Sequence, residues 1–73
     1  MKTSEKIVNE ILEMTNKHFL ENNVYVVAKT YYYEECNKEV LKESITILQN
    51  YLNVSVMQDS KGFTLMLRRK SNQ

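Results

Sequence analysis

Val54–Leu67, with the sequence VSVMQDSKGFTLML, decides the fold predicted for this chain of 73 residues. Two segments of alternating apolar and polar residues flank a polar turn, Asp59–Gly62, which holds the one glycine of the chain. This pattern is typical of a β-hairpin with one buried face. Gly62 is expected to take a positive φ in the turn. The side chains predicted to point inward from the hairpin are Val54, Val56, Phe63, Leu65 and Leu67.

Upstream of the hairpin, the sequence predicts two helices and a further strand. Apolar residues recur at helical spacing from about Ser4 to about Glu21, where Thr3 or Ser4 can cap the helix. They recur again from about Glu35 or Asn37 to about Leu52, with Asn37 as the candidate cap and Tyr51 in the apolar stripe. Residues 24–33 are rich in valine and tyrosine, which favour a pleated strand. The predicted fold class is therefore α+β, with element order α-β-α-β-β. We expect a mixed three-stranded sheet in the order 1-3-2, with both helices on one face and residues 1–73 in a single domain.

The composition disfavours several classes of protein, among them zinc-binding, dedicated nucleic-acid-binding, secreted and membrane proteins. Cys36 is the one cysteine, so the chain has no internal disulfide, and Cys36 with His18 falls short of the four ligands of a structural zinc site. The formal net charge of +1 lacks the basic excess of a dedicated nucleic-acid binder. Neither a signal peptide nor a membrane-spanning run is predicted, and a lone cysteine favours a reducing compartment, so we expect a cytoplasmic protein. No cofactor, metal or catalytic motif is predicted.

The outer side of the sheet is the candidate site. If the hairpin faces are as predicted, Met57, Met66 and Arg68 point away from the helices. In the strand over residues 24–33, alternate side chains point to opposite faces, and Lys29 indicates that its face is the outer one. The inner face would then carry Val24, Val26, Ala28, Thr30 and Tyr32. Such an outer face is too apolar for contact with water alone. The predicted protein interface consists of Tyr25, Val27, Tyr31, Met57 and Met66, with Arg68 at the rim.

A nucleic-acid interface is the alternative. Tyrosines on a sheet can stack unpaired bases, and nearby basic residues can bind phosphate. The residues assigned to this alternative are Lys29, Tyr31, Tyr33, Arg68, Arg69 and Lys70. Glu34 and Glu35 follow the tyrosines directly and repel phosphate, which disfavours it. A winged-helix arrangement would require residues 24–33 to be helical, against their valines and tyrosines.

Catalytic interpretations are weaker still. His18 could act as a general base and Cys36 as a nucleophile, but neither lies in a recognisable motif. Glu35, Glu39 and Glu43 recur every four residues, as expected of a solvated helix face. The sequence therefore predicts a non-enzymatic protein–protein interaction module. We expect it to bind itself as a two-fold dimer, or another protein, through the outer face or edge of its sheet, in the role of a small regulator, inhibitor or adaptor.

Overall fold

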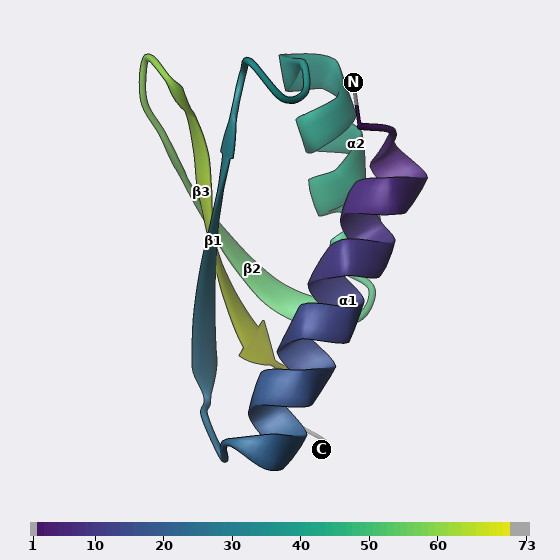
Figure 1. Cartoon of the computed structure of the whole chain (residues 1–73), viewed down its shortest axis with the longest axis vertical. Coiled ribbons are helices and arrows are strands. Elements are labelled where there is room, and N and C mark those ends of the chain that lie inside the picture. Colours follow the sequence, from purple (N-terminus) through teal and green to yellow (C-terminus); the bar gives the residue numbers. More distant parts are fainter. Residues whose placement is uncertain (1, 71–73) are drawn as a thin grey trace.

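The computed structural model describes residues 2–70 and has the predicted element order. Its elements are α1 (Ser4–Glu21), β1 (Val26–Tyr32), α2 (Lys38–Leu48), β2 (Leu52–Gln58) and β3 (Gly62–Arg69). Both helices lie on the same side of the sheet (Figure 1). The prediction of an α+β fold with a single layer of helices is confirmed.

Helix α1 begins and ends where the sequence predicts. The Thr3 hydroxyl caps it by accepting a hydrogen bond from the Lys6 N–H at 3.2 Å. Thr15 lies in the apolar stripe, and its hydroxyl donates to the Ile11 carbonyl at 2.8 Å, so its burial leaves no unpaired group. Asn23 follows the helix with φ 55°, in the left-handed region that asparagine tolerates. The buried stripe consists of Ile7, Val8, Ile11, Thr15 and Phe19.

Helix α2 is shorter than predicted. The Asn37 side chain caps its start by accepting from the Val40 N–H at 2.8 Å, which confirms Asn37 as the cap. The helix ends at Leu48 rather than near residue 52, because Leu52 pairs with β3 as the first residue of β2. Tyr51, predicted to continue the apolar stripe of the helix, is therefore exposed in the turn between α2 and β2.

The sheet has the strand order β1-β3-β2, as predicted. Both ladders are antiparallel, with Leu67 of β3 opposite Val27 of β1 on one side and Val54 of β2 on the other. Strands β1 and β2 run parallel to each other as expected, but β3 separates them. The sheet is therefore antiparallel throughout, and the predicted description of it as mixed is wrong.

The two faces of β1 are the reverse of the prediction. Tyr31 is 0 % exposed and, with Val27 and Lys29, lies on the side of the helices. Two contacts explain the orientation. The Tyr31 hydroxyl finds an acceptor in Glu10 of α1, and the Lys29 ammonium lies 5.2 Å from the centre of the Tyr31 ring. Lysine can face inward here because β1 is an edge strand, where the aliphatic stem covers apolar surface while the charge stays near water.

Gly62 has no positive φ, so the predicted reason for a glycine in this turn is wrong. The turn is closed by Asp59, whose carboxylate accepts from the N–H groups of Lys61 and Gly62 at 2.8 and 3.0 Å. A Cβ at Gly62 would lie 2.1 Å from the carbonyl oxygen of Tyr31. Glycine is required because the backbone of β1 passes too close for any side chain.

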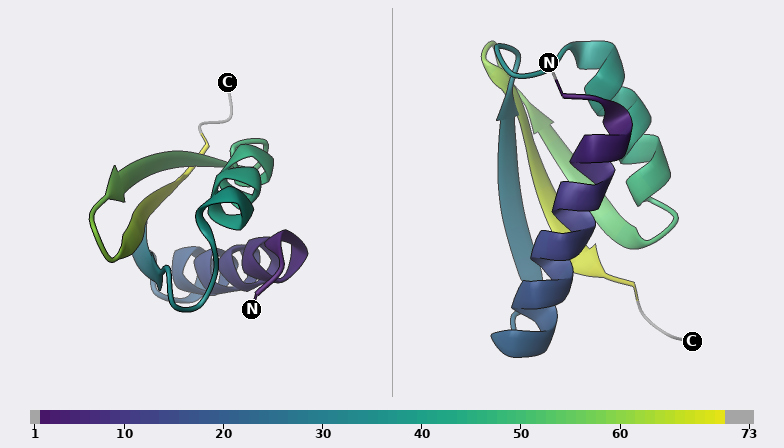
Figure 2. Two further views of the ribbon diagram at one scale, coloured as in Figure 1. Left: turned by 90° about the horizontal axis from the view of Figure 1, so that it is seen from above. Right: turned by 45° about the vertical axis from the view of Figure 1, so that its right-hand side comes forward.

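The hydrophobic core fills the space between the helices and the inner face of the sheet. From β3 it includes Phe63, Leu65 and Leu67, which are buried as predicted for the hairpin. Seen from above, the helices form one layer and the sheet the other (Figure 2). Among the described residues no helix covers the opposite side of the sheet, which therefore becomes the surface of interest.

Candidate protein-binding surface

The outer face of the sheet is formed by residues of all three strands whose side chains alternate away from the helices. Thr30, Thr64 and Met57 make one row across it, and Ala28, Met66 and Ser55 make the next. The Thr30 and Thr64 hydroxyls are hydrogen bonded at 3.0 Å, which joins β1 to β3 on this side. The outer face consists of Val26, Ala28, Thr30 and Tyr32 from β1, Thr64, Met66 and Arg68 from β3, and Asn53, Ser55 and Met57 from β2.

The outer face carries little charge and several exposed apolar groups. Within the two ladders, Arg68 is the one outer-face position with a charged side chain. Met57 is 67 % exposed and Tyr32 is 46 % exposed, and Val26 adds a further exposed apolar side chain. The solvent side of an antiparallel sheet normally carries polar residues. Apolar groups gathered on one face of a small domain are typical of an interaction surface.

The structure separates the residues predicted for the protein interface. Met57, Met66 and Arg68 lie together on the outer face as expected. Tyr25 is exposed but precedes β1, so it stands at the margin of the sheet. Val27 and Tyr31 face the helices, and their assignment to an outward surface is wrong for the physical reasons given above.

Sequence reasoning missed Val26, Ala28 and Tyr32 on the outer face. A signal for them was present. The predicted order 1-3-2 makes the first strand an edge, and edge strands often carry an inward-pointing charge that discourages pairing. Taken in that sense, Lys29 indicates the inner side of β1 and assigns the alternate residues to the outer face.

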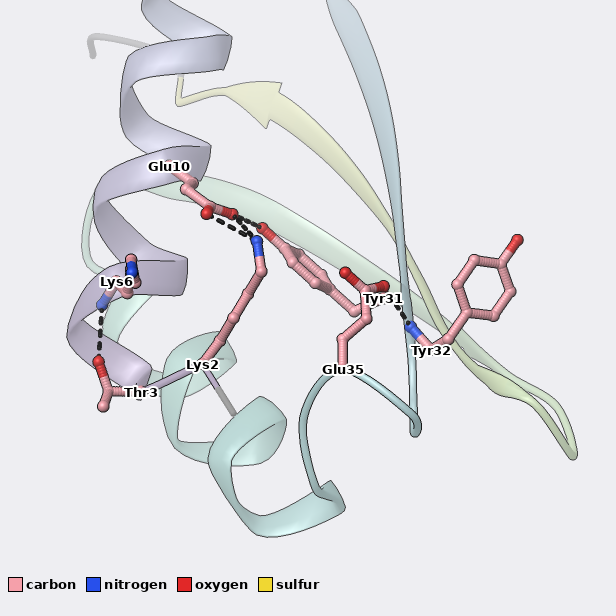
Figure 3. Close-up of polar contacts among 7 residues, drawn as sticks. All are labelled: Lys2, Thr3, Lys6, Glu10, Tyr31, Tyr32 and Glu35. Atoms are coloured by element: carbon pink, nitrogen blue, oxygen red, sulfur yellow. Dashed lines mark hydrogen bonds and ion pairs between the residues drawn. The ribbon is translucent and has the colours of Figure 1, made fainter.

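Tyr31, which the sequence pattern assigned to the outer face, belongs to a polar cluster on the helix side of the sheet (Figure 3). Its hydroxyl donates to Glu10 Oε1 at 3.0 Å, and Lys2 Nζ donates to both oxygens of the same carboxylate at 2.9 and 2.7 Å. The hydrogen bond from Lys2, with that from Tyr31, holds the pKa of Glu10 below its ordinary value. Burial, with the bond to Glu10, raises the pKa of Tyr31. This cluster joins the N-terminus, α1 and β1 and is structural in character.

The residues assigned to nucleic-acid binding do not share one surface. Arg68 points outward, whereas the guanidinium of Arg69 lies 5.8 Å from the centre of the Phe19 ring on the helix side. Lys29 is on the helix side as well, against Tyr31. Tyr33 packs edge to face against Phe63 at 5.7 Å between ring centres, and Lys70 is an exposed residue just after β3. A single strand of nucleic acid could not contact all of these groups at once.

The residues considered for catalysis also lie apart. Cys36 is fully buried in the loop that enters α2, and burial raises the pKa of its thiol, which favours the unreactive protonated form. His18 is in the last turn of α1, with Nδ1 3.1 Å from the side-chain nitrogen of Asn22. These two segments are at opposite ends of the molecule (Figure 1). Within residues 2–70 no group of three or more histidine, cysteine or acidic side chains could hold a metal ion.

Two of the acidic residues near α2, Glu35 and Glu43, make hydrogen bonds within the fold. The Glu35 carboxylate accepts from the Tyr32 N–H at 3.1 Å, and the Glu43 carboxylate accepts from the Ser4 hydroxyl at 2.7 Å (the first of these bonds is drawn in Figure 3). A depression of about 550 Å³ lies at the end of the sheet beside Tyr32. Its lining consists of Tyr32, Tyr33, Glu34, Ser60 and Lys61, a set with no arrangement of catalytic groups.

Comparison of the chain with models of protein families, with curated proteins and with solved structures gave no match. Among the described residues, neither helix has the length and apolar character needed to cross a lipid bilayer. The fold is that of a small two-layer α+β domain, and inferences about its function depend on the chemistry of its own surface.

Proposed function

We propose that this chain is a non-enzymatic protein–protein interaction module that binds a second copy of itself through the outer face or an edge of its sheet. The observation that carries the proposal is the outer face. It combines exposed Met57 and Tyr32 with a single charge at Arg68, on a sheet that has helices on one side only. A small cytoplasmic regulator, inhibitor or adaptor that acts as a dimer is the role we assign to it.

Size and composition support this proposal. A chain of 73 residues buries only about 60 % of the surface that its unfolded form exposes, so its stability is marginal. It has one cysteine and no set of metal ligands within the described residues, and association with a second chain is a common remaining source of stability. Methionine and tyrosine suit an interface because both bury a large area, methionine with an adaptable shape and tyrosine with a hydroxyl that can still pair.

Sedimentation equilibrium over a range of protein concentrations tests the proposal. The wild-type chain is expected to form a dimer, and Met57→Asp is expected to shift it toward the monomer because the added carboxylate must lose water in the interface. Asn16→Asp is the matched control. It adds the same charge at an exposed position of α1, on the other side of the molecule, and is expected to leave the equilibrium unchanged. A wild-type chain that stays monomeric at high concentration contradicts self-association.

A further inference from the structure

The two edges of the sheet differ in how they are protected. Lys29 of β1 and Val56 of β2 are both opposite Leu65 of β3, so they occupy equivalent places at the two ends of one row on the helix side. One edge therefore presents an inward-pointing ammonium group and the other an isopropyl group. An inward charge on an edge strand is a common protection against pairing with another chain.

The β1 edge is also occupied by its own loop. The Tyr32 N–H donates to the Glu35 carboxylate at 3.1 Å, and the Tyr32 carbonyl accepts from the N–H groups of Glu35 and Cys36 at 2.8 and 3.3 Å. These bonds use the backbone groups that a further strand would need at this end of β1. A strand added to β1 would have to displace them and accommodate Lys29.

Within residues 2–70, strand β2 has no such protection. Its sequence, LNVSVMQ, contains neither charge nor proline, and among the described strands it has β3 as its one neighbour. Val56 is 41 % exposed although it lies on the helix side of the sheet, opposite Leu65. Long, uncharged and apolar edges of this kind readily pair with another strand.

The hydrogen-bond pattern shows which backbone groups of β2 are free. The Asp59 N–H donates to the Gly62 carbonyl at 3.0 Å, which makes these residues a hydrogen-bonded pair. Such pairs alternate along an antiparallel ladder, so Met57, Ser55 and Asn53 bond to β3. The groups directed toward the open edge belong to Leu52, Val54, Val56 and Gln58.

We infer that β2 pairs antiparallel with β2 of a second copy of this chain, around a two-fold axis at Ser55, so that two sheets become one. The inference rests on the proposed self-association and specifies its geometry. In this register Val54 of each copy is opposite Val56 of the other and exchanges both backbone hydrogen bonds with it. Ser55 meets Ser55 of the other copy in a pair without hydrogen bonds, and Met57 lies beside Asn53.

Symmetry favours a second copy over an unrelated strand. A two-fold axis places each residue close to the axis beside the same residue of the other chain. A charged residue there would therefore meet a like charge and be repelled. The uncharged β2 has no such conflict and forms two apolar valine pairs across the junction. The same operation on β1 would bring Lys29, the central residue of that strand, against a second Lys29. The β2 edge is therefore suited to pairing with a second copy, and the β1 edge is not.

Cysteine cross-linking tests the register. Pairs without hydrogen bonds have Cα atoms about 4.5 Å apart, a separation that a disulfide can span. Under mild oxidation Ser55→Cys is expected to give most of the chain as a disulfide-linked dimer. Ala28→Cys is the control because Ala28 is exposed on the same outer face but on β1, and it is expected to stay mainly unlinked.

A lysine placed on β2 tests the edge without relying on oxidation. Val56→Lys gives β2 the charge that β1 has in the same row, and we expect its dimer dissociation constant to rise at least tenfold. Circular dichroism should show an unchanged fold because Val56 is already partly exposed. Asn16→Lys, on the exposed side of α1, is expected to dimerise as the wild type does.

The outcomes separate the two proposals. If the wild type dimerises, Val56→Lys leaves its dissociation constant unchanged and Ser55→Cys is not cross-linked, then pairing at the β2 edge is wrong. Self-association through the outer face would still stand. A wild-type monomer overturns both. A dimer that Ser55→Cys links and Val56→Lys dissociates supports self-association and places it at the β2 edge.

Discussion

The Tyr31 hydroxyl donates a hydrogen bond to Glu10 Oε1 at 3.0 Å, and this contact joins an edge strand to the helix that covers it (Figure 3). Lys2 completes the cluster through both oxygens of the same carboxylate. The contact explains why β1 turns Tyr31, and with it Lys29, toward the helices, and it leaves Tyr32 on the outer face.

Tyr31→Phe is expected to lower the free energy of unfolding by about 1 kcal/mol, because the Glu10 carboxylate loses one donor while keeping Lys2. Urea unfolding followed by circular dichroism measures the change. Tyr32→Phe is the matched control. The Tyr32 side chain points away from the helices and is 46 % exposed, so its hydroxyl can be replaced with little effect. Equal losses in both variants would contradict a specific role for the contact with Glu10.

The same cluster predicts how stability falls in acid. The pKa of Glu10 is held below its ordinary value of 4.5, first by the hydrogen bond from Lys2. The unfolded chain therefore binds the proton more readily, and stability decreases as the pH falls from about 4.5 through the lower pKa of the folded state. Glu10→Gln should flatten this part of the curve of stability against pH. Glu13→Gln, an exposed position one turn further along α1, should leave it as it is.

Tyr31 predicts a loss of stability at high pH. Burial raises its pKa above the ordinary value of 10.0, so the unfolded chain releases the proton first. The stabilisation from the neutral phenol is complete below that value and is lost as the pH rises above it. Thermal unfolding measured between pH 8 and about pH 11 should show a steeper decline for the wild type than for Tyr31→Phe. Parallel curves would contradict the prediction.

Gly62→Ala is expected to destabilise the chain by about 1–3 kcal/mol, because the added methyl group meets the Tyr31 carbonyl 2.1 Å away and forces β1 and β3 apart. Thermal denaturation is a sufficient measurement. Ser60→Ala changes an exposed residue of the same turn and should leave the midpoint within a degree or two. A tolerated Gly62→Ala would show that the two backbones can separate at little cost.

The nucleic-acid alternative has its own test. Because Arg68 and Arg69 point to opposite sides of β3, we expect a fluorescently labelled single-stranded oligonucleotide to show no binding at low salt. Fluorescence anisotropy measures this directly. Tight binding that weakens with added salt and with Arg68→Ala would restore the alternative.

Helical periodicity was sufficient to predict the approximate bounds of α1, since its apolar stripe and a cap at Thr3 or Ser4 are both local signals. The inward face of the hairpin also followed from simple alternation, as buried Phe63, Leu65 and Leu67 show. The end of α2 could not be predicted in the same way. Leu52 suits a helical stripe and a strand equally well, and only its pairing with Arg69 settles which one it joins.

The part of the candidate surface that the hairpin contributes could be predicted from the sequence, and the part that β1 contributes could not. Met57 and Met66 followed from the hairpin, but the residues that β1 contributes did not. Both alternating sets of β1 contain apolar residues and tyrosines, so neither is clearly the buried one. A lysine normally indicates the solvent side of a strand, whereas at a sheet edge its long stem can lie along the core.

The sequence by itself determined the α+β class and the element order, because hydrophobic periodicity and turn residues act over short distances along the chain. The order of the strands followed from general rules on how strands are connected. Only the tertiary structure decided which side of β1 faces the helices, and why Gly62 must be glycine. Those outcomes depend on contacts of Tyr31 with Glu10 and with the β3 backbone, between segments that are distant in sequence. Local patterns carry no information about which distant group will be the partner.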